Sequence, residues 1–356
     1  MKILSVGRAF PSHYYDQEQL LEAVRTFWMR EHFNPERLER LHKNVLVGGR
    51  YLSLPLEEYE RLENWGDANN AWIRVSQEVG EAAIRDAIER ADLPIDRIGA
   101  FFTTTVTGLV TPSLDAHLLN RIDLREDIKR IPIFGLGCVG GAAGLARAAD
   151  YVRAFPDQVA LLLSVELCSL TVQRQDLSIA NLIATGLFGD GGAAALVAGD
   201  EVPLEGAAAT KPRPRIVETR SIFYRDSQSI MGWDISHQGF RIVLSADVPN
   251  MVGRHLLQDI DRFLADHGLE RSDIGVWVAH PGGPRVLTEM EKHLELPSDA
   301  LDITWRTLKE AGNLSSASVL LVLGDTLEER APEPGTWGLL LAMGPGFCSE
   351  LILLRW

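Results

Sequence analysis

The stretch IPIFGLGCVGGAAGLARAAD, residues 131–150, constrains the fold of this 356-residue chain more than any other segment. It is typical of a short apolar strand, a turn flanked by glycines with Cys138 at its apex, and a helix of small residues. A thiol in that place meets the first free amides and the positive end of a helix, which favour the thiolate and lower the pKa. The segment therefore predicts a strand-to-helix turn that presents a nucleophilic cysteine.

The same glycines allow two other interpretations. Gly135, Gly137 and Gly140 spell G-x-G-x-x-G between a strand and a helix, which is the dinucleotide-binding fingerprint. Glu166 follows the next apolar strand, at the place where a ribose-binding acid would sit. The third interpretation is a tight strand-to-helix crossing with a buried structural thiol. The segment alone does not choose among the three.

Composition narrows the function classes. A formal net charge of −14 at pH 7 argues against nucleic-acid binding as the main task. Three widely separated cysteines form neither a disulfide framework nor a zinc pattern, and we expect Cys168 and Cys348 to be packing thiols. The first residues lack the apolar core of a signal peptide, and no apolar run is long enough to span a bilayer. We therefore expect a reduced, cytoplasmic protein with no membrane span.

Strands and helices alternate along both halves of the chain. The first half contains a strand KILSVG, a charged helical region to about residue 64, a helix at 71–91, and strands GAFFTTTV, VALLLSVE and FGDGGAAALV. Residues 201–215 interrupt this pattern with proline, alanine and charge. The second half contains a helix at 250–267, the strand IGVWVA and a closing hairpin with a glycine turn. We predict two similar α/β halves with mixed sheets, residues 1–205 and 206–356.

Two further residues bear on Cys138. His280 ends an apolar strand just before the turn PGGP, a position that exposes an imidazole at a sheet edge. Asn313 follows Gly312 and precedes a helix, where asparagine is also a favoured N-cap. Each residue alone has an ordinary structural explanation. Together, a cysteine, a histidine and an asparagine at strand ends or helix starts are the parts of an acyl-transfer site.

Five ordered blocks now make a family recognisable. GLGCVGGAAGL, FGDGGAAALV, HPGGPRVL, GNLSSASVLLVL and MGPGF closely resemble the type III polyketide synthases, the chalcone-synthase-like branch of the thiolase superfamily. The resemblance extends from the first strand to the last hairpin, and it removes the dehydrogenase interpretation. It implies an α/β thiolase fold, with duplicated βαβαβαββ halves in five α-β-α-β-α layers, and a homodimer.

The resemblance also implies a role for each candidate residue. Cys138 would accept a starter acyl group from a coenzyme A thioester. His280 would form an ion pair with the thiolate and, with Asn313, donate hydrogen bonds to a thioester carbonyl. Decarboxylation of malonyl-CoA leaves an enolate oxyanion, so preorganised donors at that oxygen lower the barrier. Acyl-CoA and malonyl-CoA would be the partners, and no metal or organic cofactor would be required.

Coenzyme A binding calls for positive charge. Arg37, Arg40 and Lys43 lie at helical spacing in PERLERLHKN, with Arg50 close behind. Arg37 and Arg40 match the family's coenzyme A contacts, and Lys43 matches more loosely. The alternative is a solvated helix face on which acidic residues alternate with these bases.

The expected tunnel departs from that of the plant enzymes. The two phenylalanines that gate the plant tunnel fall near Val172 and Ile242, and a cavity threonine corresponds to about Val106. Thr111, in the loop beyond Val106, is the fourth residue that we expect to line the tunnel. These changes replace aromatic and polar walls by aliphatic ones, which suit an alkyl chain.

We therefore expect a bacterial alkylpyrone- or alkylresorcinol-type enzyme, in which an acyl-CoA starter is extended by malonyl units and cyclised. Two alternatives stay open: a tetrahydroxynaphthalene synthase primed by malonyl-CoA itself, and a ketoacyl synthase III-like condensing enzyme. A catalytically silent binding protein on the same fold is the interpretation from another class. The presence of all three catalytic residue types argues against that last interpretation.

Overall fold

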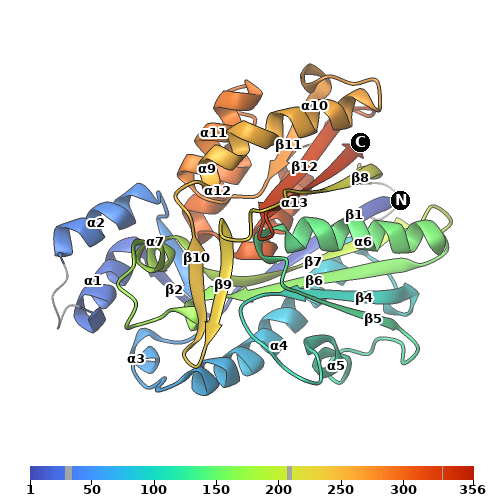
Figure 1. The fold of residues 1–356 in the computed structure, drawn as a ribbon. Helices are drawn as coiled ribbons and strands as arrows, with labels where there is room; N and C mark the ends of the chain where they lie inside the picture. Colours follow the sequence, from blue (N-terminus) through green and yellow to red (C-terminus); the bar gives the residue numbers. More distant parts are fainter. Residues whose placement is uncertain (29–33, 207–210, 331) are drawn as a thin grey trace.

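A mixed sheet of nine strands runs through the chain in the computed structural model, which describes residues 1–28, 34–206, 211–330 and 332–356 (Figure 1). Its strands lie in the order β11-β12-β13-β8-β1-β7-β6-β4-β5. The first half of the chain supplies β1 (Lys2–Ala9), β4 (Ile98–Thr105), β5 (Lys129–Phe134), β6 (Val159–Leu167) and β7 (Asp190–Ala198). The second half supplies β8 (Arg215–Phe223), β11 (Ile274–Ala279), β12 (Trp337–Gly344) and β13 (Cys348–Arg355).

The two halves of the sheet share one pairing pattern. In the first half, β1 pairs antiparallel with β7, and β7 pairs antiparallel with β6. In the second half, β8 pairs antiparallel with β13, and β13 pairs antiparallel with β12. β6 pairs parallel with β4, and β12 pairs parallel with β11 in the same way. Lys2 opposite Arg215 joins the two halves into one sheet. The predicted duplication within a layered α/β fold is therefore confirmed in its pairing.

The full βαβαβαββ order is present only in the first half. β5 has no counterpart among the described residues of the second half, where residues 296–301 form turns between two helices. The sequence LPSDAL there contains a proline and two polar residues and no alternating apolar run, so it lacks the pattern of a strand. The prediction of an equal second repeat is wrong at this strand.

Helices form three layers around the sheet, as Figure 1 shows. α6 (Gly140–Ala154) and α13 (Ser318–Glu329) lie between the two halves and share one hydrophobic cluster with strands of both. α4 (Trp65–Ala91) packs on the other face of the first half, and α10 (Leu257–Ala265) and α11 (Pro284–Leu294) pack on that of the second. The expected five layers are therefore present. The small residues of α6 permit its central place, because a Cβ on Gly141 would lie 2.1 Å from the Ser316 carbonyl oxygen.

Eleven further α-helices and strands complete the described part of the fold. They are β2 (His13–Asp16), α1 (Gln17–Trp28), α2 (Pro35–Asn44), β3 (Gly49–Leu52), α3 (Leu56–Tyr59), α5 (Leu114–Leu119), α7 (Ile179–Leu187), β9 (Met231–Ser236), β10 (Gly239–Leu244), α9 (Val248–Met251) and α12 (Asp302–Ala311). The region to residue 64 is thus not wholly helical, since β2 pairs with β3. The expected helix at 250–267 is interrupted by a π-helical turn at Val252–Leu256.

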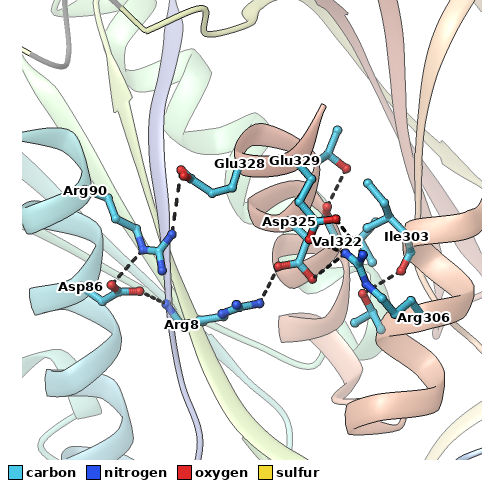
Figure 2. Close-up of polar contacts among 11 residues, drawn as sticks. Arg8, Asp86, Arg90, Ile303, Arg306, Val322, Asp325, Glu328 and Glu329 are labelled. Carbon is cyan, nitrogen blue, oxygen red and sulfur yellow. Dashed lines mark hydrogen bonds and ion pairs between the residues drawn. The ribbon is translucent and has the colours of Figure 1, made fainter. Parts of the chain in front are cut away.

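A charged network links the two halves (Figure 2). The guanidinium of Arg8 in β1 pairs with Asp325 of α13 at 2.5 Å, and the Arg8 backbone N–H donates to Asp86 of α4 at 2.8 Å. Arg306 of α12 pairs with Glu329 of α13 at 2.5 Å. Partly exposed pairs contribute little to stability one by one, but this network joins β1 and helices from both halves.

Candidate active site

Cys138 lies at the point where β5 turns into α6. It occupies the single 3-10 turn Gly137–Val139, and α6 begins at the next residue. Gly135 and Gly137 adopt positive φ angles of 92° and 55°, a backbone region that favours glycine, and so reverse the chain over a few residues. Cys138 is 6% exposed, and it lines a cavity.

The structure brings the segments of the three predicted catalytic residues together. Asn313 Nδ2 donates to the carbonyl oxygen of Gly282 at 3.4 Å, two residues beyond His280. Asn313 Oδ1 accepts from the Ser315 backbone N–H at 2.8 Å. The side chains of Ser315 and Asn313 also lie near enough to Cys138 to lower the pKa of its thiol. The amide of Asn313 is therefore oriented so that one N–H of its NH₂ group remains available as a donor.

Burial governs the charge state of the cysteine and the histidine. Burial raises the pKa of Cys138 to about 12, although the side chains of Ser315 and Asn313 oppose the rise. Burial likewise lowers the pKa of His280 to about 3. The expectation of a thiol pKa lowered by the helix terminus is thus not met, because desolvation of the sulfur outweighs that effect. Both groups are neutral when each is taken singly.

The imidazole of His280 is available for chemistry. Neither of its ring nitrogens has a hydrogen-bond partner within the described part of the chain. Transfer of the thiol proton to this imidazole would create opposite charges that compensate each other, which neither group achieves alone. A thiolate and an imidazolium formed in this way need no additional charged residue to balance them.

Glu166 lies at the back of the site and is fully engaged by the protein. Its Oε2 accepts from the Val106 backbone N–H at 3.1 Å and from Thr107 Oγ1 at 2.9 Å, and its Oε1 accepts from Ser316 Oγ. Burial raises the pKa of Glu166 to about 7. The carboxylate therefore fixes the turn next to Ser315, and it is not free to bind a ribose.

A cavity of about 730 Å³ extends from Cys138. Val106, Val172 and Ile242 line it as predicted, whereas Thr111 is not among its lining residues. Thr111 lies in the turn beyond β4, three residues before the start of α5, outside the wall. The expected aliphatic wall is only partly right, because five aromatic residues also line the cavity: Tyr59, Trp65, Phe188, Trp233 and Phe240.

One wall of this cavity is a hairpin that the sequence analysis did not predict. β9 and β10 form their own two-stranded sheet, with Trp233 opposite Ile242 and Met231 opposite Leu244. All four of these residues line the cavity, as expected for alternate positions on one face of a hairpin. The period-two pattern on either side of the short turn at residues 237–238, just before Gly239, is the signal that could have revealed it.

The predicted coenzyme A residues lie together on α2. Arg37, Arg40 and Lys43 are all exposed, and none of them lines the cavity. Lys43 pairs with Glu39 at 2.7 Å, whereas Arg37 and Arg40 form no ion pair with a described residue. Two guanidinium groups on this helix are therefore available to an anion.

Two kinds of feature are absent from the described ranges. No group of three histidine, cysteine, aspartate or glutamate side chains is arranged to hold a metal ion. No helix there is both long and apolar enough to cross a membrane.

The fold brings the segments of Cys138, His280 and Asn313 together, and sequence comparison then identifies the family. The chain belongs to the chalcone and stilbene synthase family: the N-terminal domain of that family matches residues 1–201 and the C-terminal domain matches residues 215–356. It is thus a type III polyketide synthase, an acyltransferase of a family that uses coenzyme A thioesters.

Individual relatives cover nearly the whole chain. A 1,3,6,8-tetrahydroxynaphthalene synthase of Streptomyces peucetius subsp. caesius is 48% identical, over 99% of this chain and 93% of its own length. The crystal structure of the 1,3,6,8-tetrahydroxynaphthalene synthase of Streptomyces coelicolor A3(2) has 31% identity, covers 100% of this chain and 99% of its own, and superposes with a TM-score of 0.92. The type III domain of Steely1 from Dictyostelium shares the fold, with a TM-score of 0.92 at 23% identity over 99% and 98% of the two chains. The predicted thiolase-type fold is confirmed.

Proposed function

We propose that this chain is a malonyl-CoA-primed synthase of 1,3,6,8-tetrahydroxynaphthalene. The observation that supports this proposal most is the 48% identity to the Streptomyces peucetius enzyme over 99% of the chain. The proposal adopts an alternative from the sequence analysis in place of the alkyl-starter interpretation. Aromatic residues along the cavity favour a flat product as well, since rings stack on rings.

The product sets the balance of the reaction. A naphthalene has ten ring carbons, which correspond to five two-carbon units. Five malonyl-CoA molecules give one tetrahydroxynaphthalene, five carbon dioxide, five free coenzyme A and one water. The sulfur of Cys138 attacks the thioester carbonyl of the starter, and coenzyme A leaves as the thiol after it takes up the proton. This loading step needs the thiolate, which proton transfer to His280 provides.

Extension needs an oxyanion site. Loss of carbon dioxide from an extender malonyl-CoA leaves an enolate, whose carbon attacks the carbonyl of the acyl-Cys138 thioester and releases the cysteine. Asn313 Nδ2 and a ring N–H of His280 are the donors that we assign to the enolate oxygen. The orientation of the Asn313 amide by Ser315 supports this role, because a donor fixed in advance needs no reorganisation during the reaction.

Arg37 and Arg40 are the residues that we propose for the coenzyme A phosphates, with Lys43 nearby. A bidentate guanidinium suits a phosphate, and both arginines are exposed and form no ion pair with a described residue.

We also propose a homodimer through β5, a strand at one end of the sheet. Phe134, the last residue of β5, is 47% exposed, and an apolar sheet edge of this kind favours pairing with a second copy.

A second candidate function keeps the alkyl starter. Aliphatic residues do form part of the cavity wall, among them Leu52, Leu56, Val172 and Ile242. An apolar wall stabilises a methylene chain by about 0.8 kcal/mol per buried CH₂.

Incubation with malonyl-CoA as the sole substrate tests the proposal. Tetrahydroxynaphthalene identified by mass spectrometry, and absent with Cys138→Ala, is the expected result. A product that forms only after an acyl-CoA is added, as an alkylpyrone or alkylresorcinol, would favour the second candidate. Intact-protein mass spectrometry with a panel of acyl-CoAs identifies the loaded starter directly.

A further inference from the structure

Arg50 of β3 is a buried cation for which the reaction outlined above has no use. It is 3% exposed, and it forms no ion pair with any carboxylate of the described residues. Its Nη1 donates to the carbonyl oxygen of Gly186 at 2.7 Å, and its Nη2 donates to that of Thr185. These carbonyls belong to the last turn of α7, where a positive charge is favourable. A buried guanidinium is costly, so this contact is a specific feature of the fold.

The end of α7 holds Asn313 by its backbone. The Asn313 N–H donates to the carbonyl oxygen of Leu187 at 2.9 Å, and the Gly189 N–H donates to the carbonyl oxygen of Asn313 at 3.0 Å. The backbones of Phe188 and Asn313 thus form an isolated β-bridge. The position of Asn313 therefore depends on residues 187–189, which directly follow the two residues whose carbonyls Arg50 binds.

The stem of Arg50 also packs against the two glycines of this bridge. A Cβ on Gly189 would lie 3.1 Å from Cβ of Arg50, and one on Gly312 would lie 3.7 Å from its Cδ. A Cβ on Gly312 would further lie 2.7 Å from the Leu187 carbonyl oxygen. Arg50 thus contacts both sides of the pairing that aligns Asn313.

The same guanidinium is linked to the helix that we assign to coenzyme A. Arg50 Nη1 donates to Gln17 Oε1 at 2.7 Å. Gln17 Nε2 in turn donates to the carbonyl oxygens of His42 in α2 at 3.3 Å and of Gly186 at 3.1 Å. One network therefore joins α2, the end of α7 and the turn of Asn313.

We propose that Arg50 is a positioning residue for decarboxylative condensation: it holds the end of α7 so that Asn313 Nδ2 points at the thioester oxygen. This inference rests on the proposed function of Asn313 as an oxyanion donor. Loss of Arg50 should then slow the enolate-forming step and leave the loading of Cys138 nearly unchanged, because Arg50 does not touch the sulfur. The kcat for malonyl-CoA decarboxylation should fall, with little change in KM, because Gln17 keeps its own bonds to the carbonyls of His42 and Gly186 without Arg50.

A double-mutant cycle tests this coupling. Decarboxylation of malonyl-CoA is measured for the wild type, Arg50→Gln, Asn313→Ala and the double variant, with Cys138 loading followed by intact mass. Arg50→Gln should slow decarboxylation about tenfold to a hundredfold in the presence of Asn313, as expected for a displaced oxyanion donor. In the Asn313→Ala background the same change should cost about twofold or less, because the two residues act as a unit.

Arg213 offers a matched control. It is 7% exposed, and its Nη1 donates to the carbonyl oxygen of Leu327 near the end of α13 at 3.1 Å. Arg213→Gln removes a buried arginine from a helix terminus without contact to Asn313, so decarboxylation should stay within about twofold of the wild type.

Each other result has a definite meaning. An equal loss with and without Asn313, or no loss in Arg50→Gln, would overturn the inference and leave the proposed function intact. A wild-type protein that does not decarboxylate malonyl-CoA would overturn the proposed function. If Arg50→Gln does not fold, Arg50→Lys takes its place, because lysine keeps the charge but lacks the fork that binds two carbonyls. A loss in Arg50→Lys that disappears with Asn313→Ala supports the inference, and a loss that persists overturns it.

Discussion

Glu166→Gln should change how the stability of this protein depends on pH. The carboxyl group is fully buried, and burial raises its pKa from the ordinary value of 4.5 to about 7. Between these two pH values the folded protein therefore holds one proton more than the unfolded chain. Its contribution to stability is complete below about pH 4.5 and is lost as the pH rises through about 7.

The size of the effect follows from the pKa difference. One pKa unit corresponds to about 1.4 kcal/mol, so ionisation of Glu166 should cost the folded state about 3 kcal/mol across this range. Glutamine has nearly the same shape and does not titrate, so the difference in unfolding free energy between wild type and Glu166→Gln isolates this one group. We expect the wild type to lose about 3 kcal/mol relative to the variant between pH 4 and pH 8.

Urea unfolding at a series of pH values, at one fixed protein concentration, measures this difference. A difference that stays flat with pH would refute the reasoning, because Glu166 would then have the same pKa in both states. A wild type that gains stability relative to the variant as the pH rises would show that the donors from Val106, Thr107 and Ser316 outweigh burial.

Three further outcomes are expected. Val172→Phe should narrow the cavity and shift acyl-CoA use toward shorter chains. If the chain-length selectivity in a panel of acyl-CoA starters is unchanged, Val172 does not limit the space for the starter. His280→Ala should move the alkylation of Cys138 by iodoacetamide to higher pH, because burial then raises the thiol pKa without a compensating imidazolium; an unchanged pH profile would contradict the proton transfer. Phe134→Lys should give a monomer in light scattering, because the charge would be buried at a paired edge; an unaltered dimer would place the interface elsewhere.

The sequence predicted much of this site because its key residues belong to local patterns. The glycines around Cys138 and the positions of His280 and Asn313 at the ends of elements are visible within a few residues. Such signals survive folding, because backbone turns of this kind demand glycine wherever they occur. The placement of all three segments in one site then agreed with the whole-chain resemblance.

The cavity wall was predicted less well. The β9–β10 hairpin was not expected, Thr111 does not line the cavity, and Phe188 does. A wall is made by side chains from distant segments, and no local period records which of them meet. The prediction of an equal second repeat also failed, because residues 296–301 form turns and lack an apolar run.

The amino-acid sequence by itself determined the alternation of strands and helices and the turn that presents Cys138, and it nominated His280 and Asn313 as candidate partners, because these depend on backbone conformation and short-range pattern. Only the tertiary structure decided that burial raises the pKa of the Cys138 thiol more than the helix terminus lowers it. It also decided that aromatic side chains line the cavity, and that Arg50 is buried beside the turn of Asn313. The physical reason is the same in each case. Desolvation and packing depend on what surrounds a group, and the surroundings come from parts of the chain far away in sequence.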